Sequence, residues 1–238
     1  EQKLRYNEAI HLVEEKMAGD ISVKNRNKLL AERVIKNLKA RKFDAYYTET
    51  AQEAAQKVLS LIPAKASVSW GGTQTMEELK VLEAVRSGDY NAIDRDTAKT
   101  PEERQELMHK AFFADVYLTS FNAMSEDGVL INIDGMGNRV AAIAYGPKSV
   151  IAVVSMNKIC KTTESARDRA RNYAAPVNVQ RCNLNPHFAQ ITGTPCSKTG
   201  SCGDCTAADC ICSYIVETRM SKVPGRIKII LVDEPLGI

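Results

Sequence analysis

Long apolar runs are missing from this sequence of 238 residues. No stretch approaches the ~20 apolar residues that a helix needs to cross a bilayer. Residues 1–15 are charged and helical in pattern, without the apolar segment of a secretory signal. Internal repeats and low-complexity tracts are also absent. We therefore expect a cytoplasmic protein without a membrane span.

A concentrated charge of one sign is missing as well. The 32 basic and 29 acidic residues are well mixed, and the formal net charge is +3. Only residues 36–42 approach a basic patch, and they fit the solvated face of a helix better than a nucleic-acid contact. A hydrophobic fraction of 44% excludes wholesale disorder. We predict a globular protein that does not bind nucleic acid.

Familiar catalytic signatures are absent too. The sequence has no Ser-His-Asp or His-Glu-x-x-His arrangement and no phosphate loop of the Gly-x-x-x-x-Gly-Lys type. His187 leads toward a cysteine-rich loop and could be a ligand, although a lone histidine is more often structural. These patterns leave open whether the protein is an enzyme.

Strand and helix patterns alternate after an N-terminal helical segment. We expect helices over residues 6–16, 24–43, 51–61, 76–85 and 163–173, and a helix that begins at Thr100. Strands are expected over residues 44–48, 67–70, 90–93, 115–120, 129–134, 149–154 and 226–232. Residues 150–154 are uniformly apolar, as in a strand that is covered on both faces. The sequence thus predicts an α/β fold, an open and mostly parallel sheet flanked by helices.

The length favours one core with an appendage over two full domains. We assign residues 1–43 to an N-terminal helical segment and residues 44–238 to the α/β domain. Within that domain, residues 182–223 have few apolar runs. We interpret them as a cysteine-rich insertion that something other than hydrophobic packing holds together.

Two glycine-containing turns are candidate ligand sites, because ligands of parallel sheets bind at the carboxyl ends of strands. The first turn is Gly71-Gly72-Thr73, between a strand and a helix. Paired glycines let the backbone approach a ligand closely, and free N–H groups attract anions. Such a turn can equally need glycine only for its backbone freedom.

The second turn places polar groups around two glycines where an apolar strand ends. Its candidate ligand-binding residues are Asn132, Asp134, Gly135, Gly137, Asn138 and Arg139. Arg139 could clamp a carboxylate or phosphate through two parallel hydrogen bonds. Alternatively, it could pair with Asp134 and only stiffen the turn. Asp127-Gly128, just upstream, is a tight-turn signal that needs no ligand to explain it.

Five of the seven cysteines fall within 17 residues near the C-terminus. The candidate metal ligands are Cys196, Cys202, Cys205, Cys210 and Cys212. Without a secretory signal a reducing compartment is expected, where clustered thiols more often bind metal or do redox work than form disulfides. Short spacings let several thiolates converge at little cost in loop closure.

The uneven spacing favours an iron–sulfur cluster. Zinc usually takes its ligands from two Cys-x-x-Cys pairs, whereas only Cys202 and Cys205 form one here. A cluster needs four cysteines and tolerates uneven spacing, which leaves one thiol spare. Zinc remains an alternative, and so do disulfides or a redox-active Cys202/Cys205 pair.

Residues 67–73, 114–123, 126–140 and 145–148 together resemble the lactate-utilization (LUD) domain family, in particular its short, stand-alone members related to lactate utilization protein C. The resemblance implies a fold similar to the sugar-phosphate isomerase and CoA-transferase superfamily. It implies that Gly71, Gly72 and Thr73 cradle a phosphate or acyl group and that residues 134–139 face them. It also implies a link to lactate oxidation beside iron–sulfur partner proteins.

Two functions follow as hypotheses. The first is a redox-linked subunit in the metabolism of lactate or another small 2-hydroxy or 2-keto acid, with a 4Fe–4S cluster in the cysteine loop. The second is a non-redox binding or assembly protein. In that case the ligand is a phosphorylated metabolite, nucleotide or acyl group, and zinc or disulfides hold the loop. Both hypotheses expect a small anionic ligand.

Overall fold

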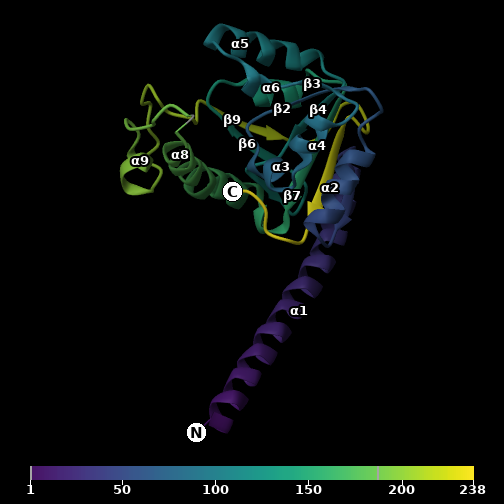
Figure 1. The fold of residues 1–238 in the computed structure, drawn as a ribbon, viewed down its shortest axis with the longest axis vertical. Helices are drawn as coiled ribbons and strands as arrows, with labels where there is room; N and C mark the ends of the chain where they lie inside the picture. Colours follow the sequence, from purple (N-terminus) through teal and green to yellow (C-terminus); the bar gives the residue numbers. More distant parts are fainter. Residues whose placement is uncertain (1, 187) are drawn as a thin grey trace.

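A parallel sheet of six strands forms the centre of the computed structural model (Figure 1). The model describes the backbone of residues 2–186 and 188–238 and the side chains of residues 21–186 and 188–238, so His187 lies outside the described residues. The strand order is β1-β10-β7-β4-β2-β3, and all five neighbouring pairs are parallel. The strands are β1 (Asp44–Thr48), β2 (Ser67–Trp70), β3 (Asn91–Ile93), β4 (Val116–Thr119), β7 (Ser149–Ser155) and β10 (Ile227–Val232).

The central strand β7 is buried on both faces, as its apolar run predicts. Val150, Ala152 and Val154 pack into one hydrophobic core, whereas Ile151 and Val153 pack into a second core on the opposite face. Alternate residues of a strand point to opposite faces, so an almost uninterrupted apolar run is needed to fill both cores.

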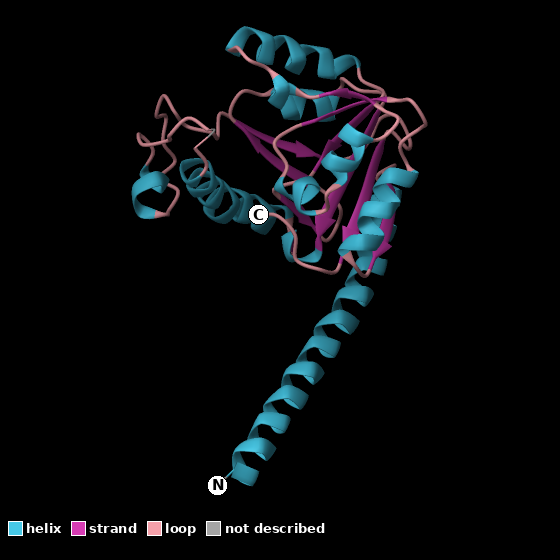
Figure 2. Ribbon diagram, viewed as in Figure 1, coloured by secondary structure: helices cyan, strands magenta, loops and turns pink. Residues whose placement is uncertain are grey.

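Helices cover the two faces of this sheet (Figure 2). Helices α1 (Gln2–Ala40) and α6 (Asn138–Ala144) contribute to one core. Helices α2 (Ala51–Ser60), α3 (Gln74–Glu78) and α4 (Val81–Ser87) contribute to the other. Near the strand ends lie α5 (Pro101–Lys110) and short 3₁₀ turns at Arg95–Thr97, Ala111–Phe113 and Met156–Lys158. The described chain thus has the predicted α/β architecture.

A second sheet lies beside the first, in the order β8-β5-β6-β9. Its strands are β5 (Ala123–Ser125), β6 (Leu130–Asp134), β8 (Ile159–Cys160) and β9 (Tyr214–Thr218). The turn between β5 and β6 is the one that Asp127-Gly128 predicts, and Gly128 has a φ of +89°. A third hydrophobic cluster lies between this sheet and the helices that follow β8.

One long helical stretch follows β8. It consists of α7 (Thr163–Arg169), a π-helical turn (Ala170–Ala174) and α8 (Ala175–Leu184). After it, α9 (Pro195–Thr199) opens the cysteine loop. The π turn rotates the side chains that follow it relative to those of α7. The sequence predicts a helix only over residues 163–173, which is eleven residues short at its C-terminal end.

Several other element predictions need correction. Residues 6–16 and 24–43 were expected as separate helices, but α1 is continuous, because a helix tolerates an internal glycine at a cost of about 1 kcal/mol. The expected helix over residues 76–85 is broken at Lys80, whose backbone is left-handed. The strand predicted over residues 129–134 is present as β6, and it belongs to the second sheet. Strands β5 and β8 are two or three residues long and leave no periodic signal.

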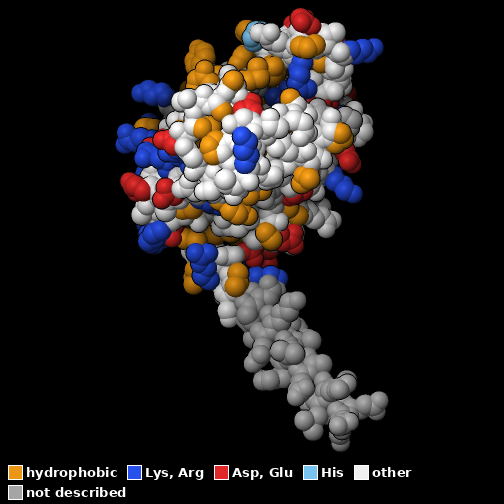
Figure 3. Space-filling model, turned by 90° about the vertical axis from the view of Figure 1, so that its left-hand side faces the viewer, with side chains coloured by type: hydrophobic (Ala, Val, Ile, Leu, Met, Phe, Trp, Pro, Cys, Tyr) orange, Lys and Arg blue, Asp and Glu red, His pale blue; other side chains and the backbone are white. Residues whose placement is uncertain are grey.

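Basic and acidic side chains are interspersed over the face shown in Figure 3. Within the described part of the chain, no helix is both long enough and apolar enough to traverse a bilayer.

Candidate functional site

A pocket of about 370 Å³ lies where the loops after four parallel strands meet. Residues 72–75 follow β2, Arg95 follows β3, Ser120 follows β4 and Lys158 follows β7. The remaining wall comes from the turn between β6 and α6, from α5 and α8, from the cysteine loop and from Ile238. This is the place where an open α/β sheet ordinarily binds its ligand, and the volume suits a small metabolite.

The lining of this pocket is strongly basic, and we call it the basic pocket. Its positively charged residues are Arg95, Arg104, Arg139, Lys158 and Arg181. Among the described lining residues only Asp134 is acidic. Because low-dielectric walls strengthen the field of such a charge excess, the basic pocket attracts anions.

Arg95 is a cation of the pocket whose hydrogen-bonding capacity is not satisfied within the described chain. Its Nε atom is buried and makes no hydrogen bond with a described residue. This Nε forms an ion pair with a carboxylate oxygen of Asp96 at 3.9 Å, which is too long for a hydrogen bond, and Nη1 donates to the sulfur of Met108 at 3.8 Å. A buried guanidinium N–H without an acceptor is costly, and an anion in the pocket would remove that cost.

Lys158 is the most deeply buried of these cations, with 2% of its surface exposed. Its Nζ atom lies 3.2 Å from Thr75 Oγ1 and 3.3 Å from Ser120 Oγ. The pKa of Lys158 is lowered to about 7, mainly by burial and less by the nearby Arg169, although Glu78 partly offsets this. The structure gives it no ion pair with a described carboxylate. At neutral pH a large fraction of this amine is therefore uncharged.

Asp134 is occupied by backbone contacts. Its two carboxylate oxygens accept hydrogen bonds from the backbone N–H groups of Met136, Gly137, Arg139 and Val140, at 3.0 to 3.2 Å. These are the free donors at the start of α6, and Gly137 adopts the left-handed backbone that the turn requires. Asp134 therefore positions the turn, and its ion pair with Arg139 offsets only part of the charge of the basic pocket.

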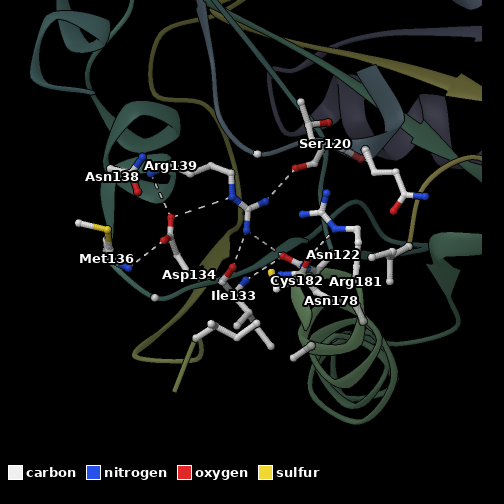
Figure 4. A pocket seen from close by; sticks show the side chains of 18 of the residues that line it. Ser120, Asn122, Ile133, Asp134, Met136, Asn138, Arg139, Asn178, Arg181 and Cys182 are labelled. Atoms are coloured by element: carbon white, nitrogen blue, oxygen red, sulfur yellow. Dashed lines mark hydrogen bonds and ion pairs between the residues drawn. The ribbon is translucent and has the colours of Figure 1, made fainter. Parts of the chain in front are cut away.

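Arg139 lies between the turn and the strand ends, as Figure 4 shows. Its Nη1 donates to Ser120 O at 3.3 Å. Its Nη2 donates to Asn122 Oδ1 at 3.2 Å and also to Ile133 O. Nε is 4.0 Å from Asp134 Oδ2. Most of its donors are thus engaged within the protein, and burial lowers its pKa. Arg139 braces the pocket wall and keeps little capacity to clamp a ligand.

The structure brings together six of the nine residues that the sequence singles out as ligand-binding. Those lining the basic pocket are Gly72, Thr73, Asp134, Gly135, Asn138 and Arg139. Gly71 lies behind them, and a Cβ there would be 2.9 Å from Tyr117 Oη and 3.0 Å from Arg139 Cδ. Asn132 is buried in β6 and donates toward Ser120 O. Gly137 faces a neighbouring surface groove.

Sequence reasoning missed most of the charged lining. Arg95, Ser120 and Lys158 each follow a strand closely, so the strand-end rule applied to every strand could have found them. Arg104 is on α5, and Arg181 is on α8, which the sequence did not predict. No sequence signal comparable to the end of a strand marks Arg104 or Arg181. Figure 4 shows Arg181 approaching the pocket from α8, opposite Arg139.

The five candidate metal ligands surround one small cavity. Cys196, Cys202, Cys205, Cys210 and Cys212 all line a space of about 50 Å³ between the cysteine loop and α8, which we call the thiol cavity. Nη2 of Arg171, on the π turn, is 3.9 Å from Cys202 Sγ. The pKa of Cys212 is raised to about 12, mainly by burial and less by the neighbouring Cys210. All seven cysteines are free thiols in the structure.

The thiol cavity is not arranged around a single ion. Among the side chains that the structure describes, no group of three or more His, Cys, Asp and Glu residues is positioned to hold one metal ion. Zinc would need four donors at about 2.0 to 2.3 Å from one point. A cluster is larger and takes four thiolates from around its outside, and the five thiols that line the thiol cavity are donors of that type.

The thiol cavity and the basic pocket share a wall. Ala175 and Ile211 line both. Ile211 lies between Cys210 and Cys212, and Gly135 is opposite it, where an added Cβ would be 3.3 Å from Ile211 Cα. The two cavities are therefore separated by about one layer of residues.

A sequence model of the LUD domain matches residues 31–232 of the chain. The chain belongs to the LUD domain family. The matched region begins inside α1, at the first of its residues that enter the core, and includes the basic pocket and the cysteine loop. No curated protein sequence matches the chain significantly.

Solved structures with a similar fold include a DUF162 family protein from Deinococcus radiodurans. It is 13% identical, with a TM-score of 0.49 over 87% of this chain and 98% of that one. A D-ribose-5-phosphate isomerase in complex with phospho-erythronic acid is 17% identical, with a TM-score of 0.34 over 48% of this chain and 54% of the isomerase. The ribose 5-phosphate isomerase from Plasmodium falciparum is 14% identical, with a TM-score of 0.31 over 47% and 52%.

Proposed function

We propose that this LUD domain is a redox-linked protein of lactate or other small 2-hydroxy or 2-oxo acid metabolism. In this proposal the basic pocket binds the acid and the thiol cavity holds an iron–sulfur cluster. The observation that carries the proposal is the shared wall, in which Ala175 and Ile211 line both cavities. Such adjacency is what a redox group needs in order to act on a bound metabolite.

Cluster ligation would use Cys196, Cys202, Cys205 and one of Cys210 and Cys212, since four thiolates suffice. A bound cluster supplies one-electron chemistry, and Arg171 would stabilise the thiolate of Cys202. Oxidation of a 2-hydroxy acid to a 2-oxo acid releases two electrons and two protons. The proposal therefore includes iron–sulfur partner proteins as electron acceptors.

A second candidate is a non-redox protein that binds a phosphorylated metabolite, nucleotide or acyl ligand, with zinc or disulfides in the loop. The size and charge of the basic pocket favour it. Four arginines, one buried lysine and a volume of about 370 Å³ are more than a three-carbon monocarboxylate requires. A phosphorylated ligand would match that charge better.

Anion titrations by calorimetry test the common part of both candidates. L-lactate, pyruvate, inorganic phosphate and pyrophosphate are each added to the wild type, to Arg95→Met and to Arg167→Met. We expect Arg95→Met to weaken binding about tenfold, or about 1.4 kcal/mol, because Arg95 carries the unsatisfied Nε. Arg167→Met removes the same charge, but Arg167 pairs with Glu217 and lies outside the pocket. This variant should therefore bind the anions normally.

The ranking of the four anions separates the two candidates. Preference for lactate or pyruvate supports the 2-hydroxy and 2-oxo acid function, whereas preference for pyrophosphate supports the phosphorylated ligand. If no anion binds the wild type, or if Arg95→Met binds all four normally, the basic pocket is not the ligand site.

A further inference from the structure

Lys158 has an environment that anion binding alone does not explain. Its Nζ atom is in contact with two hydroxyl groups, those of Thr75 and Ser120. Ser120 donates its own hydroxyl hydrogen to Val153 O at 2.8 Å, so its oxygen is an acceptor toward Lys158. A charged ammonium has three N–H donors and no lone pair. Within the described chain, only two acceptors contact this nitrogen.

A neutral amine fits these contacts better. It donates its two hydrogens to Thr75 and Ser120 and keeps one lone pair, and Lys158 lines the basic pocket. The charged groups that act on it from neighbouring elements are Arg169 on α7, Glu78 on α3 and Arg139 on α6. Two of these three are positive, so the uncharged amine is favoured. A desolvated lysine beside other cations is an effective nucleophile.

We propose that Lys158 Nζ forms an imine with the carbonyl carbon of a small anionic aldehyde or 2-oxo acid bound in the basic pocket. This inference rests on the proposed binding of an anionic metabolite there. The Nζ lone pair forms the new C–N bond. The carbonyl oxygen then leaves as water with the two amine hydrogens, so no oxidant or reductant is consumed. The pocket arginines hold the carboxylate or phosphate of the substrate.

Gly237 limits the space around this nitrogen. A Cβ at position 237 would lie 2.9 Å from Lys158 Nζ and 2.3 Å from Thr75 Oγ1. The residue therefore packs directly against the amine, where only a glycine fits without displacing its neighbours. The C-terminal segment thus holds Lys158 in contact with its two hydroxyl acceptors.

Reductive trapping tests the proposal in the full chain. The protein is incubated with pyruvate or with pyridoxal 5′-phosphate as the carbonyl probe, reduced with cyanoborohydride, digested and examined by mass spectrometry. Lys148 is the internal reference, because its side chain is 80% exposed and it lies outside the basic pocket. We expect Lys158 to be labelled about tenfold faster than Lys148 at pH 7.5, because Lys158 lines the basic pocket and burial lowers its pKa to about 7.

Calorimetry with phosphate on the same sample separates the two proposals. If phosphate binds but neither probe labels Lys158 faster than Lys148, the imine proposal is wrong and the binding proposal stands. If phosphate does not bind and Lys158 is not labelled preferentially, both are wrong. Preferential labelling that is lost in Arg95→Met supports both, since it shows that the pocket presents an anionic carbonyl compound to Lys158.

Discussion

Anaerobically purified protein is expected to contain about four iron atoms and four sulfides per chain, and Cys202→Ser is expected to lose them. Cys202 lines the thiol cavity, belongs to the single Cys-x-x-Cys pair and has Arg171 beside its sulfur. Removal of one thiolate leaves an iron without its protein ligand. Iron and acid-labile sulfide analysis, together with the visible thiolate-to-iron absorption, measures the effect.

Cys160→Ser is the matched control for that loss. Cys160 is a half-buried thiol on β8 and lies outside the thiol cavity. Its variant should keep full iron and colour. Of Cys210 and Cys212, one should also be replaceable, because the cavity offers five thiols for four positions. Colourless protein with about one zinc per chain would contradict the cluster and support the second candidate function.

Replacement of Lys158 by methionine is expected to stabilise the protein at pH 6. Burial lowers the pKa of Lys158 from 10.5 to about 7, and each unit corresponds to about 1.4 kcal/mol. Below pH 7 the lysine is protonated in both states, so the folded state carries the full cost of burying the charge. Methionine fills a similar volume without that cost. We expect an increase in unfolding free energy of about 5 kcal/mol at pH 6.

The pH dependence of that difference identifies its cause. Between pH 7 and 10.5 the folded state binds fewer protons than the unfolded state, so the stability of the wild type rises with pH over this range. The advantage of Lys158→Met should therefore shrink above pH 7 and be close to zero at pH 10. Urea denaturation at pH 6, 8 and 10 measures it, and exposed Lys148→Met is the control. A difference that does not change with pH would show that packing, not charge, is responsible.

The parallel sheet was predictable because its strands have to fill two cores. The apolar run of β7 is a direct consequence of burial on both faces, and β10 has a similar run. The second sheet was predictable only at the turn between β5 and β6, since β5 and β8 are short and the pairings β5–β8 and β6–β9 join segments that are distant in sequence. Their pairing depends on tertiary packing, which local periodicity does not record.

The site was only partly predictable for a related reason. Gly72 and Asp134 stand in turns with a recognisable pattern, and both line the pocket. Asp134 accepts hydrogen bonds from the backbone of the turn, a role that is common for aspartate but that the sequence alone does not distinguish from ligand binding. The pocket charge comes largely from arginines on helices and from Lys158, whose importance lies in its burial. Burial of a single lysine has no sequence signature.

The central claim is that the basic pocket and the thiol cavity form one redox-linked site, separated by Ala175 and Ile211. Its most direct test is a titration of anaerobically purified protein with pyruvate, followed by the visible absorption and the electron paramagnetic resonance spectrum of the reduced protein. We predict that bound pyruvate changes both spectra and that Arg95→Met shifts the change to an about tenfold higher pyruvate concentration. Spectra that stay the same while calorimetry shows pyruvate bound would contradict the claim.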